Sequence, residues 1–305
     1  MHSSQDASDI VADRWDWRDG FTPLTKVDAG AGLVYPAQPD ANGYLAKADL
    51  GARWSAVDLL AELDAEGEYW VDRGNCNGTS TSPTVGMLYF LPPTASWNGG
   101  QKPDLSGGFI SVADTVLKLQ DGAAFLTFEG LSFAHARGTI FTTDVNASVS
   151  NITVTNCTVS NGGGGGLSIK KGRGVVVEQT EIFGVAGTAL EIRGGHHRSL
   201  RRSDNIVRGN FLHHYARWFR TYRPGILWGG VGNLFEDNHI GFAPHNAFLG
   251  GGNEAVCNAA PLPGRKERDL PSSPDEVCGG NDNIFQNNFI EHVCFETDDS
   301  GAFCA

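Results

Sequence analysis

The sequence has little positive charge and no long apolar segment. It contains 23 Lys and Arg residues against 35 Asp and Glu residues, which gives a formal net charge of −12. Proteins that bind nucleic acid neutralise phosphates with an excess of cations, so nucleic acid is not expected as the main partner. No apolar run reaches the ~18 residues that a membrane-spanning helix needs, so we expect no membrane span.

Cysteine is also scarce, with six residues in the chain and no Cys-x-x-Cys motif. This is too few for a scaffold held together by disulfides. The pairs His196-His197 and His213-His214 consist of adjacent residues, and adjacent residues on a strand face opposite ways. One pair should therefore not supply two zinc ligands. We expect no metal and no cofactor, with calcium as the one alternative.

The compartment stays open at this stage. The N-terminus has neither a basic start nor an apolar core, so it does not look like a signal peptide. Cys257 and Cys278 bracket a proline-rich segment that a disulfide could close in an oxidising compartment, two unrelated thiols being the alternative. Four Asn-x-Ser/Thr sequons, which also arise by chance in a chain rich in Asn and Thr, weakly favour an extracellular location. They begin at Asn77, Asn146, Asn151 and Asn156.

Glycine, in contrast, is abundant at 40 of 305 residues and has no Gly-every-third pattern, which points to many tight turns. The run Gly162–Gly166 is expected to be a flexible turn. Residues 1–108 are predicted to form a β-rich N-terminal module. In it we expect a short amphipathic helix at 56–63, two hairpin-like strands at 68–72 and 87–91, and a linker at 94–108.

From residue 109 onward a repeat appears, in which short β-branched or aromatic runs are each followed by turn residues. Six apolar triplets begin 26, 23, 30, 28 and 50 residues apart, and an apparent insertion at about 254–278 accounts for the last step. The triplets begin at Leu131, Cys157, Thr180, Asn210, Asn238 and Asn288. A period near 25 residues predicts an all-β, right-handed parallel β-helix over 109–305 rather than a doubly wound α/β sheet or an antiparallel sandwich.

A polar residue lies just before or at the start of most triplets. These residues are Asn156, Gln179, Asn210, Asn238 and Asn288. Asparagines at the same turn of successive coils can hydrogen-bond along the stack and tolerate left-handed backbone. The chain stops at Ala305 just after a strand-like run without a capping segment, so we expect a C-terminal truncation, with a short natural terminus as the alternative.

Three stretches, 59–93, 230–248 and 281–303, resemble right-handed parallel β-helix, pectate-lyase-like carbohydrate-active proteins. They are similar to the glycoside hydrolase family of β-helix α-fucosidases and xylanases. The carrying motifs include Leu-Tyr-Phe-Leu-Pro-Pro at 88–93, Glu-Asp-Asn-His-Ile at 236–240 and Asp-Asp-Ser-Gly-Ala at 298–302. The resemblance covers the chain from about residue 50 to its end. It implies a groove along one face of the coil and a pair of catalytic acids.

One acid of that pair falls on Asp299, with Asp298 beside it as the alternative. The second, in a Leu-Asp-Asp motif on a later coil, has no counterpart before Ala305, which puts catalysis in doubt because glycoside cleavage ordinarily needs two carboxylates. Glu291 and Glu296 are substitutes within the chain. Asp282, Asp298 and Asp299 are also the residues that could bind calcium.

Segment 193–223 holds 8 of the 23 basic residues of an otherwise acidic chain. Arg217, Arg220, Arg223 and Trp218, together with His245, are therefore candidate sugar-binding residues for an anionic polysaccharide, because arginine binds carboxylate and sulfate well. The alternative is a solvated loop whose arginines pair with acids on neighbouring coils. We expect a glycoside hydrolase acting on a polysaccharide or oligosaccharide. A non-catalytic β-helix module and a uronate lyase are the alternatives, and the oligomeric state stays open.

Overall fold

The computed structural model describes residues 9–13, 21–28, 30–37, 53–57, 59–72, 87–93, 108, 110–196, 199–251, 280–296 and 300–304. The chain divides into two compact units, Met1–Gly108 and Phe109–Ala305. Both are built from strands, and no helix in the described part of the chain is long and apolar enough to cross a membrane.

The N-terminal unit contains one antiparallel sheet and one hairpin. The sheet has the order β3-β2-β1-β4, with strands β1 (Asp9–Asp13), β2 (Phe21–Asp28), β3 (Leu33–Pro36) and β4 (Arg53–Val57). The expected hairpin is present as β5 (Tyr69–Val71) paired with β6 (Leu88–Phe90). Trp70 and Tyr89 lie opposite each other with ring centroids 5.5 Å apart, a cross-strand aromatic contact that holds the two strands together.

The amphipathic helix expected at 56–63 is wrong. Only one 3-10 turn, η1 (Leu60–Glu62), forms there, and Ala56 belongs to β4, where it lies opposite Ile10. Eight residues are too few for an isolated helix to be stable, because helix nucleation is costly. Pairing with β1 satisfies the backbone of the first residues of this segment instead.

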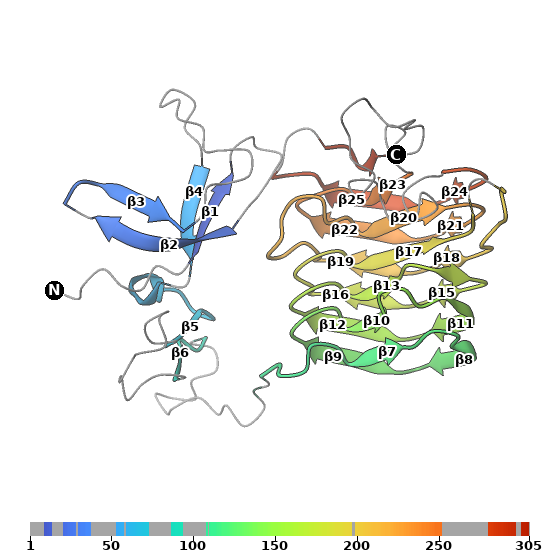
Figure 1. Cartoon of the computed structure of the whole chain (residues 1–305), viewed down its shortest axis with the longest axis horizontal. Coiled ribbons are helices and arrows are strands. Elements are labelled where there is room, and N and C mark those ends of the chain that lie inside the picture. Colours follow the sequence, from blue (N-terminus) through green and yellow to red (C-terminus); the bar gives the residue numbers. More distant parts are fainter. Residues whose placement is uncertain are drawn as a thin grey trace. The chain divides into compact units, whose positions relative to one another are not determined.

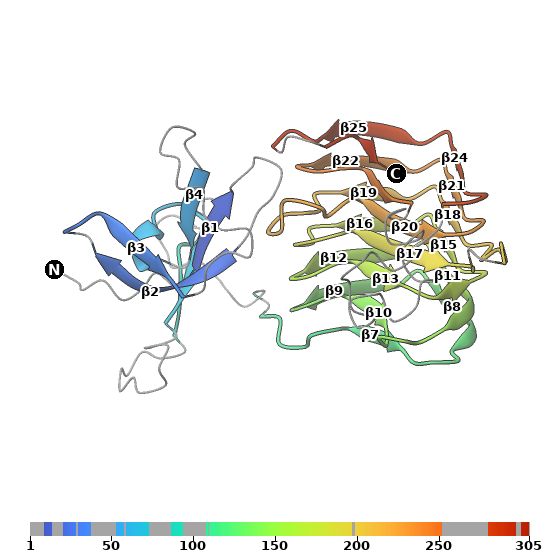
Figure 2. The same ribbon diagram turned by 45° about the horizontal axis from the view of Figure 1, so that its top comes forward.

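The second unit is an all-β, right-handed parallel solenoid with three sheets, as predicted (Figure 1, Figure 2). Sheet I contains β7 (Leu117–Leu119), β10 (Phe141–Thr143), β13 (Leu167–Ile169), β17 (Leu190–Gly194), β20 (Ile226–Gly230), β23 (Phe248–Gly250) and β26 (Phe303–Cys304). Sheet II contains β8 (Ala124–Glu129), β11 (Val149–Thr155), β14 (Gly172–Arg173), β15 (Val176–Glu178), β18 (Ile206–Arg208), β21 (Leu234–Glu236) and β24 (Ile284–Gln286). Sheet III contains β9 (Ser132–Ala136), β12 (Thr158–Gly162), β16 (Glu181–Phe183), β19 (Phe211–His213), β22 (His239–Ala243) and β25 (Phe289–Val293).

The six triplets found in the sequence lie on successive strands of sheet III. Their pairing is parallel and in register, from Ser132 opposite Thr158 up to His239 opposite Phe289, so an antiparallel sandwich is excluded for this unit. The third residue of each triplet is the one that points inward, and Val159, Ile182 and Leu212 are fully buried. Alternation of buried and outward side chains along short strands is therefore what builds the solenoid wall.

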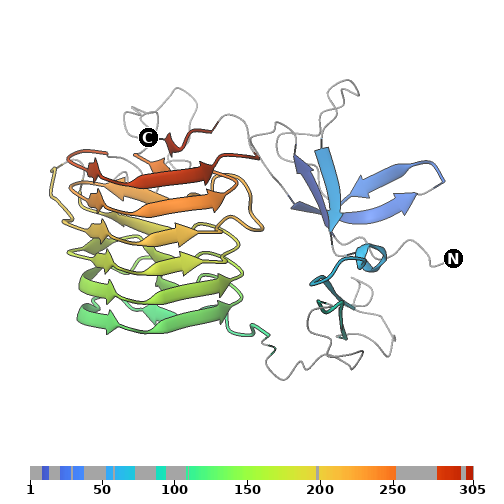
Figure 3. The same ribbon diagram turned by 180° about the vertical axis from the view of Figure 1, so that it is seen from behind.

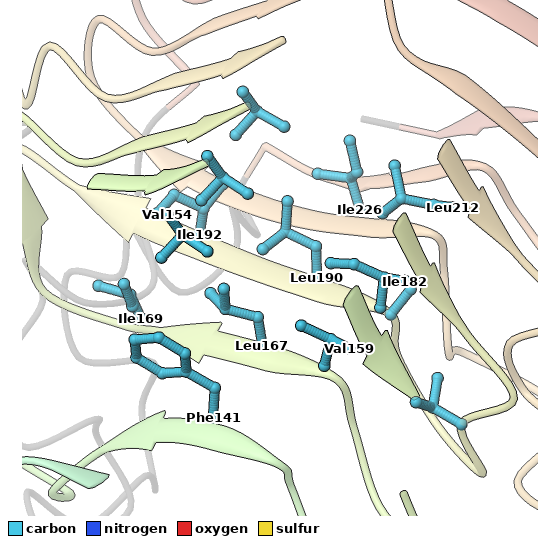
Figure 4. Packing of buried hydrophobic residues seen from close by; sticks show 14 of the residues in the cluster. Phe141, Val154, Val159, Leu167, Ile169, Ile182, Leu190, Ile192, Leu212 and Ile226 are labelled. Atoms are coloured by element: carbon cyan, nitrogen blue, oxygen red, sulfur yellow. The ribbon is translucent and has the colours of Figure 1, made fainter. Parts of the chain in front are cut away.

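Inside the solenoid, residues of equivalent position stack from coil to coil. Leu167, Leu190 and Ile226 form one such column beneath sheet I, and Val159, Ile182 and Leu212 form another beneath sheet III (Figure 4). Burial of a large aliphatic side chain contributes roughly 1.5–3 kcal/mol, so the repeated columns supply most of the driving force for coiling.

The predicted asparagine stack is present between sheets II and III, with a correction to its members. Asn210, Asn238 and Asn288 form a ladder in which each amide donates to the next Oδ1 at 2.9 Å. Asn156 and Gln179 lie one position earlier, in the column of left-handed residues with φ of 49° and 50°. A second ladder that we did not predict joins sheets I and II through Asn205, Asn233 and Asn283.

The run Gly162–Gly166 is closely packed rather than a flexible turn. A Cβ on Gly163 would lie 2.3 Å from the carbonyl oxygen of Arg137, and one on Gly166 would lie 2.4 Å from that of Ala189. Glycine is required here because the backbones of consecutive coils approach too closely for any side chain. The run is therefore part of the solenoid wall.

Candidate functional site

The candidate site lies where the chain passes from sheet III to sheet I in the last coils. Three connections meet there, residues 214–225 (the Arg loop), 244–247 and 294–302, of which 297–299 are outside the described residues. The strands of sheet III that lead into these connections are stacked in Figure 3. Each connection follows a strand of fixed register, so the rigid wall sets where each one leaves the coil.

The Arg loop is anchored to the coil before it through its backbone. The amides of Ala216 and Trp218 donate to the carbonyls of Gly187 and Ala186 at 2.9 and 3.1 Å. The Tyr215 side chain is fully buried, and its hydroxyl donates to the carbonyl of Asn246 at 2.9 Å. These hydrogen bonds hold the Arg loop against the solenoid, so it is a fixed platform rather than a flexible loop.

Four side chains of this platform face solvent. Trp218 and Tyr222 are 47% and 41% exposed, and Arg217 and Arg223 are exposed beside them. The Arg223 guanidinium lies 5.6 Å from the centroid of the Phe219 ring, and its Nη1 donates to the carbonyl of Tyr222 at 3.1 Å. Neither Arg217 nor Arg223 forms an ion pair with any acid in the described part of the chain, so their charges are available to an anion.

Arg220 differs from its two neighbours because it is paired with Glu296. Its Nε donates to Oε2 of Glu296 at 2.7 Å, and its Nη2 donates to Oε1 of the same carboxylate. Its Nη1 donates to the carbonyl of Arg217 at 3.1 Å. Two parallel hydrogen bonds of this kind give a fixed geometry. Arg220 therefore pairs with an acid two coils further along the solenoid. Pairing with an acid on the adjacent coil, the alternative weighed for the whole segment, is what Arg208 and Glu178 show.

His245 lies beneath the Arg loop rather than on its surface. Its side chain is 2% exposed, and the ring of Tyr222 lies over it at a centroid distance of 5.4 Å. Its carbonyl accepts from the amide of Cys294 at 3.4 Å, which joins two of the three connections. A direct contact between His245 and a sugar stays a prediction, and it would require Tyr222 to move.

Two further ionisable groups in this region are held neutral by burial. Desolvation raises the pKa of the Tyr215 hydroxyl far above its ordinary value. Desolvation is also the main cause that raises the pKa of the Cys294 thiol, while a hydrogen bond with Ser300 works against it. A protonated thiol is a poor nucleophile, so Cys294 does not suit nucleophilic catalysis.

The predicted acids Asp298 and Asp299 lie outside the described residues, as do Cys257, Cys278 and the inserted segment at about 254–278. Glu296, three residues before Asp299, bonds to Arg220 of the Arg loop. The structure thus places Glu296, the last described residue before the two aspartates, against Arg220, one of the arginines named from the sequence. Asp282, the remaining candidate calcium ligand, is instead within 3.8 Å of Arg202.

A second polar surface, which we did not predict, covers the outer face of sheet I in the earlier coils. Lys118, Thr142, Ser168 and Glu191 lie side by side on consecutive strands. The Glu191 side chain is only 15% exposed; it accepts from the Ser168 hydroxyl at 2.7 Å and lies 3.0 Å from Nε of Arg193. The sequence indicates such a surface only through the alternation of polar and apolar residues in these strands. Which polar residues lie side by side depends on the register between the strands, and the sequence does not give that register.

Next to this surface is an open pocket of about 310 Å³. Its lining combines two lysines, two aspartates and four threonines, together with Gly138 and Val145. The charged and hydroxyl residues are Lys118, Lys170, Asp114, Asp144, Thr115, Thr139, Thr142 and Thr143. The hydroxyl, ammonium and carboxylate groups can all hydrogen-bond to a polyol.

Comparison with known proteins supports the architecture. Residues 109–255 match the family model of the right handed beta helix region. The match begins where the solenoid begins and includes the whole Arg loop. Neither the curated proteins nor the solved structures gave a match to the chain. The solenoid is therefore a right-handed β-helix, a fold that is consistent with action on carbohydrate and that does not by itself specify an activity.

Proposed function

We propose that this protein binds an anionic polysaccharide at the Arg loop and hydrolyses it with carboxylates of segment 291–299. The observation that carries the proposal is the pair Arg217 and Arg223, exposed on an anchored loop and without an ion pair among the described residues. The exposed rings of Trp218 and Tyr222 lie on the same loop and offer flat apolar surfaces to sugar rings.

The charge of the chain supports an anionic ligand at this place in particular. A protein with a formal net charge of −12 repels polyanions over most of its surface. A polyanion would therefore bind only where cationic side chains are concentrated, as they are on the Arg loop. Guanidinium groups bind carboxylates and sulfates through paired N–H donors. Uronates and sulfated sugars are therefore the substrate classes that fit.

Asp299 is the proposed acid of the hydrolysis, with Asp298 as the alternative, and the resemblance of segment 281–303 supports this assignment. The hydroxyl-rich surface of sheet I, with its partly buried Glu191, would extend the sugar-binding surface toward the earlier coils. A general acid and a second carboxylate on opposite sides of the scissile bond would cleave it.

A non-catalytic glycan-binding module is the second candidate, and one observation favours it. Both oxygens of Glu296 are engaged by Arg220, so this carboxylate is held as an ion pair rather than being free for proton transfer.

The test is a binding and cleavage screen with polygalacturonate, heparin and neutral dextran. We expect the wild-type chain to bind one of the two polyanions, not dextran, and to release new reducing ends. Arg217→Ala with Arg223→Ala should lower affinity at least tenfold, since each charge-assisted hydrogen bond contributes roughly 1.5–3 kcal/mol. Arg208→Ala, which removes an arginine paired with Glu178 on sheet II, is the matched control.

The products separate the activities. Reducing ends that disappear in Asp299→Asn but not in Glu291→Gln support hydrolysis by Asp299. An ultraviolet-absorbing unsaturated product would instead identify a lyase. Polyanion binding without any product would leave the binding module as the function, and absence of binding to all three glycans would overturn the proposal.

A further inference from the structure

At the end of β19, where sheet III passes into the Arg loop, two imidazoles have nitrogens that face each other. Nδ1 of His213 lies 2.6 Å from Nδ1 of His214. The expectation that adjacent histidines face opposite ways is wrong here, because His214 has a left-handed backbone with φ of 50°. The equivalent residue of every coil, from His135 to His292, also has positive φ, so the reversal of alternation at His214 is a regular feature of this sheet.

A carboxylate on the coil below holds the outer side of this pair. Nε2 of His213 lies 3.1 Å from Oε1 of Glu181, which belongs to the adjacent strand β16 and lies opposite Phe211 of β19. An ionised carboxylate can only accept a hydrogen bond, so this contact places the proton of a neutral His213 ring on Nε2. Nδ1 of His213 then accepts a hydrogen bond from Nδ1 of His214, so an ion bound at both Nδ1 atoms requires the His214 proton to move through solvent to Nε2 of the same ring.

Each of the two rings stacks on a phenylalanine. The ring of Phe183 is nearly parallel to that of His213, at 3° and 5.0 Å, and Phe242 stacks on His214 at 14° and 5.7 Å. The two imidazole planes are nearly perpendicular to each other, at 84°. Stacking leaves the ring edges, where the nitrogens are, free to converge.

We propose that His213 and His214 form a binding site for a divalent cation of borderline softness, Zn²⁺ or Cu²⁺, through their two Nδ1 atoms. Glu181 is the outer carboxylate that orients His213, an arrangement that metal-binding histidines commonly have. Imidazole nitrogen suits both ions. This site lies where β19 ends and the Arg loop begins, with His214 as the first residue of that loop, and it is argued from the two imidazoles alone and not from the glycan proposal.

The distance between the two nitrogens fits this assignment after a small adjustment. Zinc–nitrogen bonds of about 2.0–2.1 Å place two ligands of a tetrahedral ion about 3.3 Å apart. The nitrogens must therefore separate by about 0.7 Å, and His214, which is exposed, can make that movement. No three or more His, Cys, Asp or Glu residues converge on one point within the described residues. The ion would thus keep open positions for water or for an oxygen of a bound ligand.

A second histidine pair on sheet III provides a matched comparison. His239 and His292 each bond to a different oxygen of Glu291, at 2.7 and 3.2 Å, so the carboxylate separates the two imidazoles. The rings resemble the first pair in type and setting. They do not face each other through their nitrogens.

The experiment titrates the full chain, without an affinity tag and with accessible thiols alkylated, with Zn²⁺ by calorimetry. Cu²⁺ electron paramagnetic resonance then counts the bound nitrogens. We expect one site with two coordinated nitrogens. His214→Ala should weaken binding at least tenfold and leave one nitrogen, and Glu181→Gln should weaken it roughly tenfold to a hundredfold, as loss of an outer carboxylate does elsewhere.

His292→Ala is the control, and it should leave affinity and nitrogen count unchanged. Circular dichroism of each variant shows that the coil is intact, and His214 is suited to replacement because it is exposed. Binding that persists unchanged in His214→Ala would overturn the proposal. So would binding that is lost in His292→Ala, because the ion would then belong to the Glu291 pair.

Discussion

Two edges of the solenoid are built by opposite rules. Between sheets II and III every coil turns with two residues, such as 209–210 and 237–238. Between sheets III and I the connection varies from four residues, 137–140, to twelve, 214–225. The short turn repeats one conformation, whereas the long edge carries the Arg loop. A fixed turn is dictated by packing, and a variable connection can carry recognition because its length does not disturb the core.

The first prediction concerns the asparagine ladder, which lies at the regular edge between sheets II and III. We expect its disruption to have the largest effect on stability. In Asn238→Ala the backbone and side-chain amides of Asn210 would both lose their acceptor on Asn238, and the carbonyl of Val207 would lose its donor. Buried polar groups left unsatisfied cost roughly 1–3 kcal/mol each, so the free energy of unfolding should fall by about 3 kcal/mol or more. Urea denaturation followed by circular dichroism measures it.

The control for the ladder is Asn146→Ala, which removes an exposed asparagine from a connection between sheets I and II. Its effect should be within about 0.5 kcal/mol, as for most surface changes. Equal losses in the two variants would mean that the ladder contributes nothing beyond an ordinary asparagine.

The second prediction concerns the variable edge where it is shortest. In Gly166→Ala the new Cβ would lie 2.4 Å from the carbonyl of Ala189 and 2.6 Å from Cγ2 of Ile182. Overpacking of this kind costs typically 1–3 kcal/mol, so the urea midpoint should fall clearly. Gly229→Ala, whose Cβ would meet only Arg193 at an ordinary 3.5 Å, should change it little. A flexible connection would tolerate both changes alike.

The same contrast explains what could be predicted from sequence. The period, the parallel strands and the Asn210, Asn238 and Asn288 ladder repeat in every upper coil, so the pattern reports them directly. The packing of Gly166 could not be predicted in this way, because it depends on where Ile182 and Ala189 of the next coil lie. Gly225 makes the equivalent contacts with Ile240 and Ala247 two coils later, but the pattern of residue types alone does not show them. The five consecutive glycines at 162–166 therefore suggested a flexible turn, whereas in the structure their backbone is in close contact with neighbouring coils.

Site prediction had the same limit. Arg217, Arg220 and Arg223 were found by their local charge density, but charge density could not separate Arg220, which is paired, from the other two. That distinction depends on Glu296, 76 positions away. The opposed nitrogens of His213 and His214 were missed because strand alternation was assumed to continue through a residue that adopts left-handed backbone.

The third prediction tests whether the Arg220–Glu296 pair ties two connections together. Both side chains are more than a third exposed, so solvent screens the pair, and a double-mutant cycle of Arg220→Ala and Glu296→Ala should give a coupling of about 0.5–1 kcal/mol. The coupling should shrink in high salt, because screening weakens exposed charges. Arg217→Ala is the control partner and should show no coupling to Glu296; equal coupling would show that general charge, not the contact, is measured.

The smallest expected effect on stability comes from Trp218→Ala, which should nevertheless change binding. Trp218 is 47% exposed on the Arg loop, so its loss should alter the free energy of unfolding by only about 0.5 kcal/mol. Aromatic residues often dominate recognition surfaces, so affinity for the bound polyanion should fall about fivefold to tenfold. Phe125→Ala removes an 81% exposed ring from sheet II and should leave binding unchanged. If both variants bind equally well, recognition does not reside at the variable edge, and the division between a structural edge and a functional edge fails.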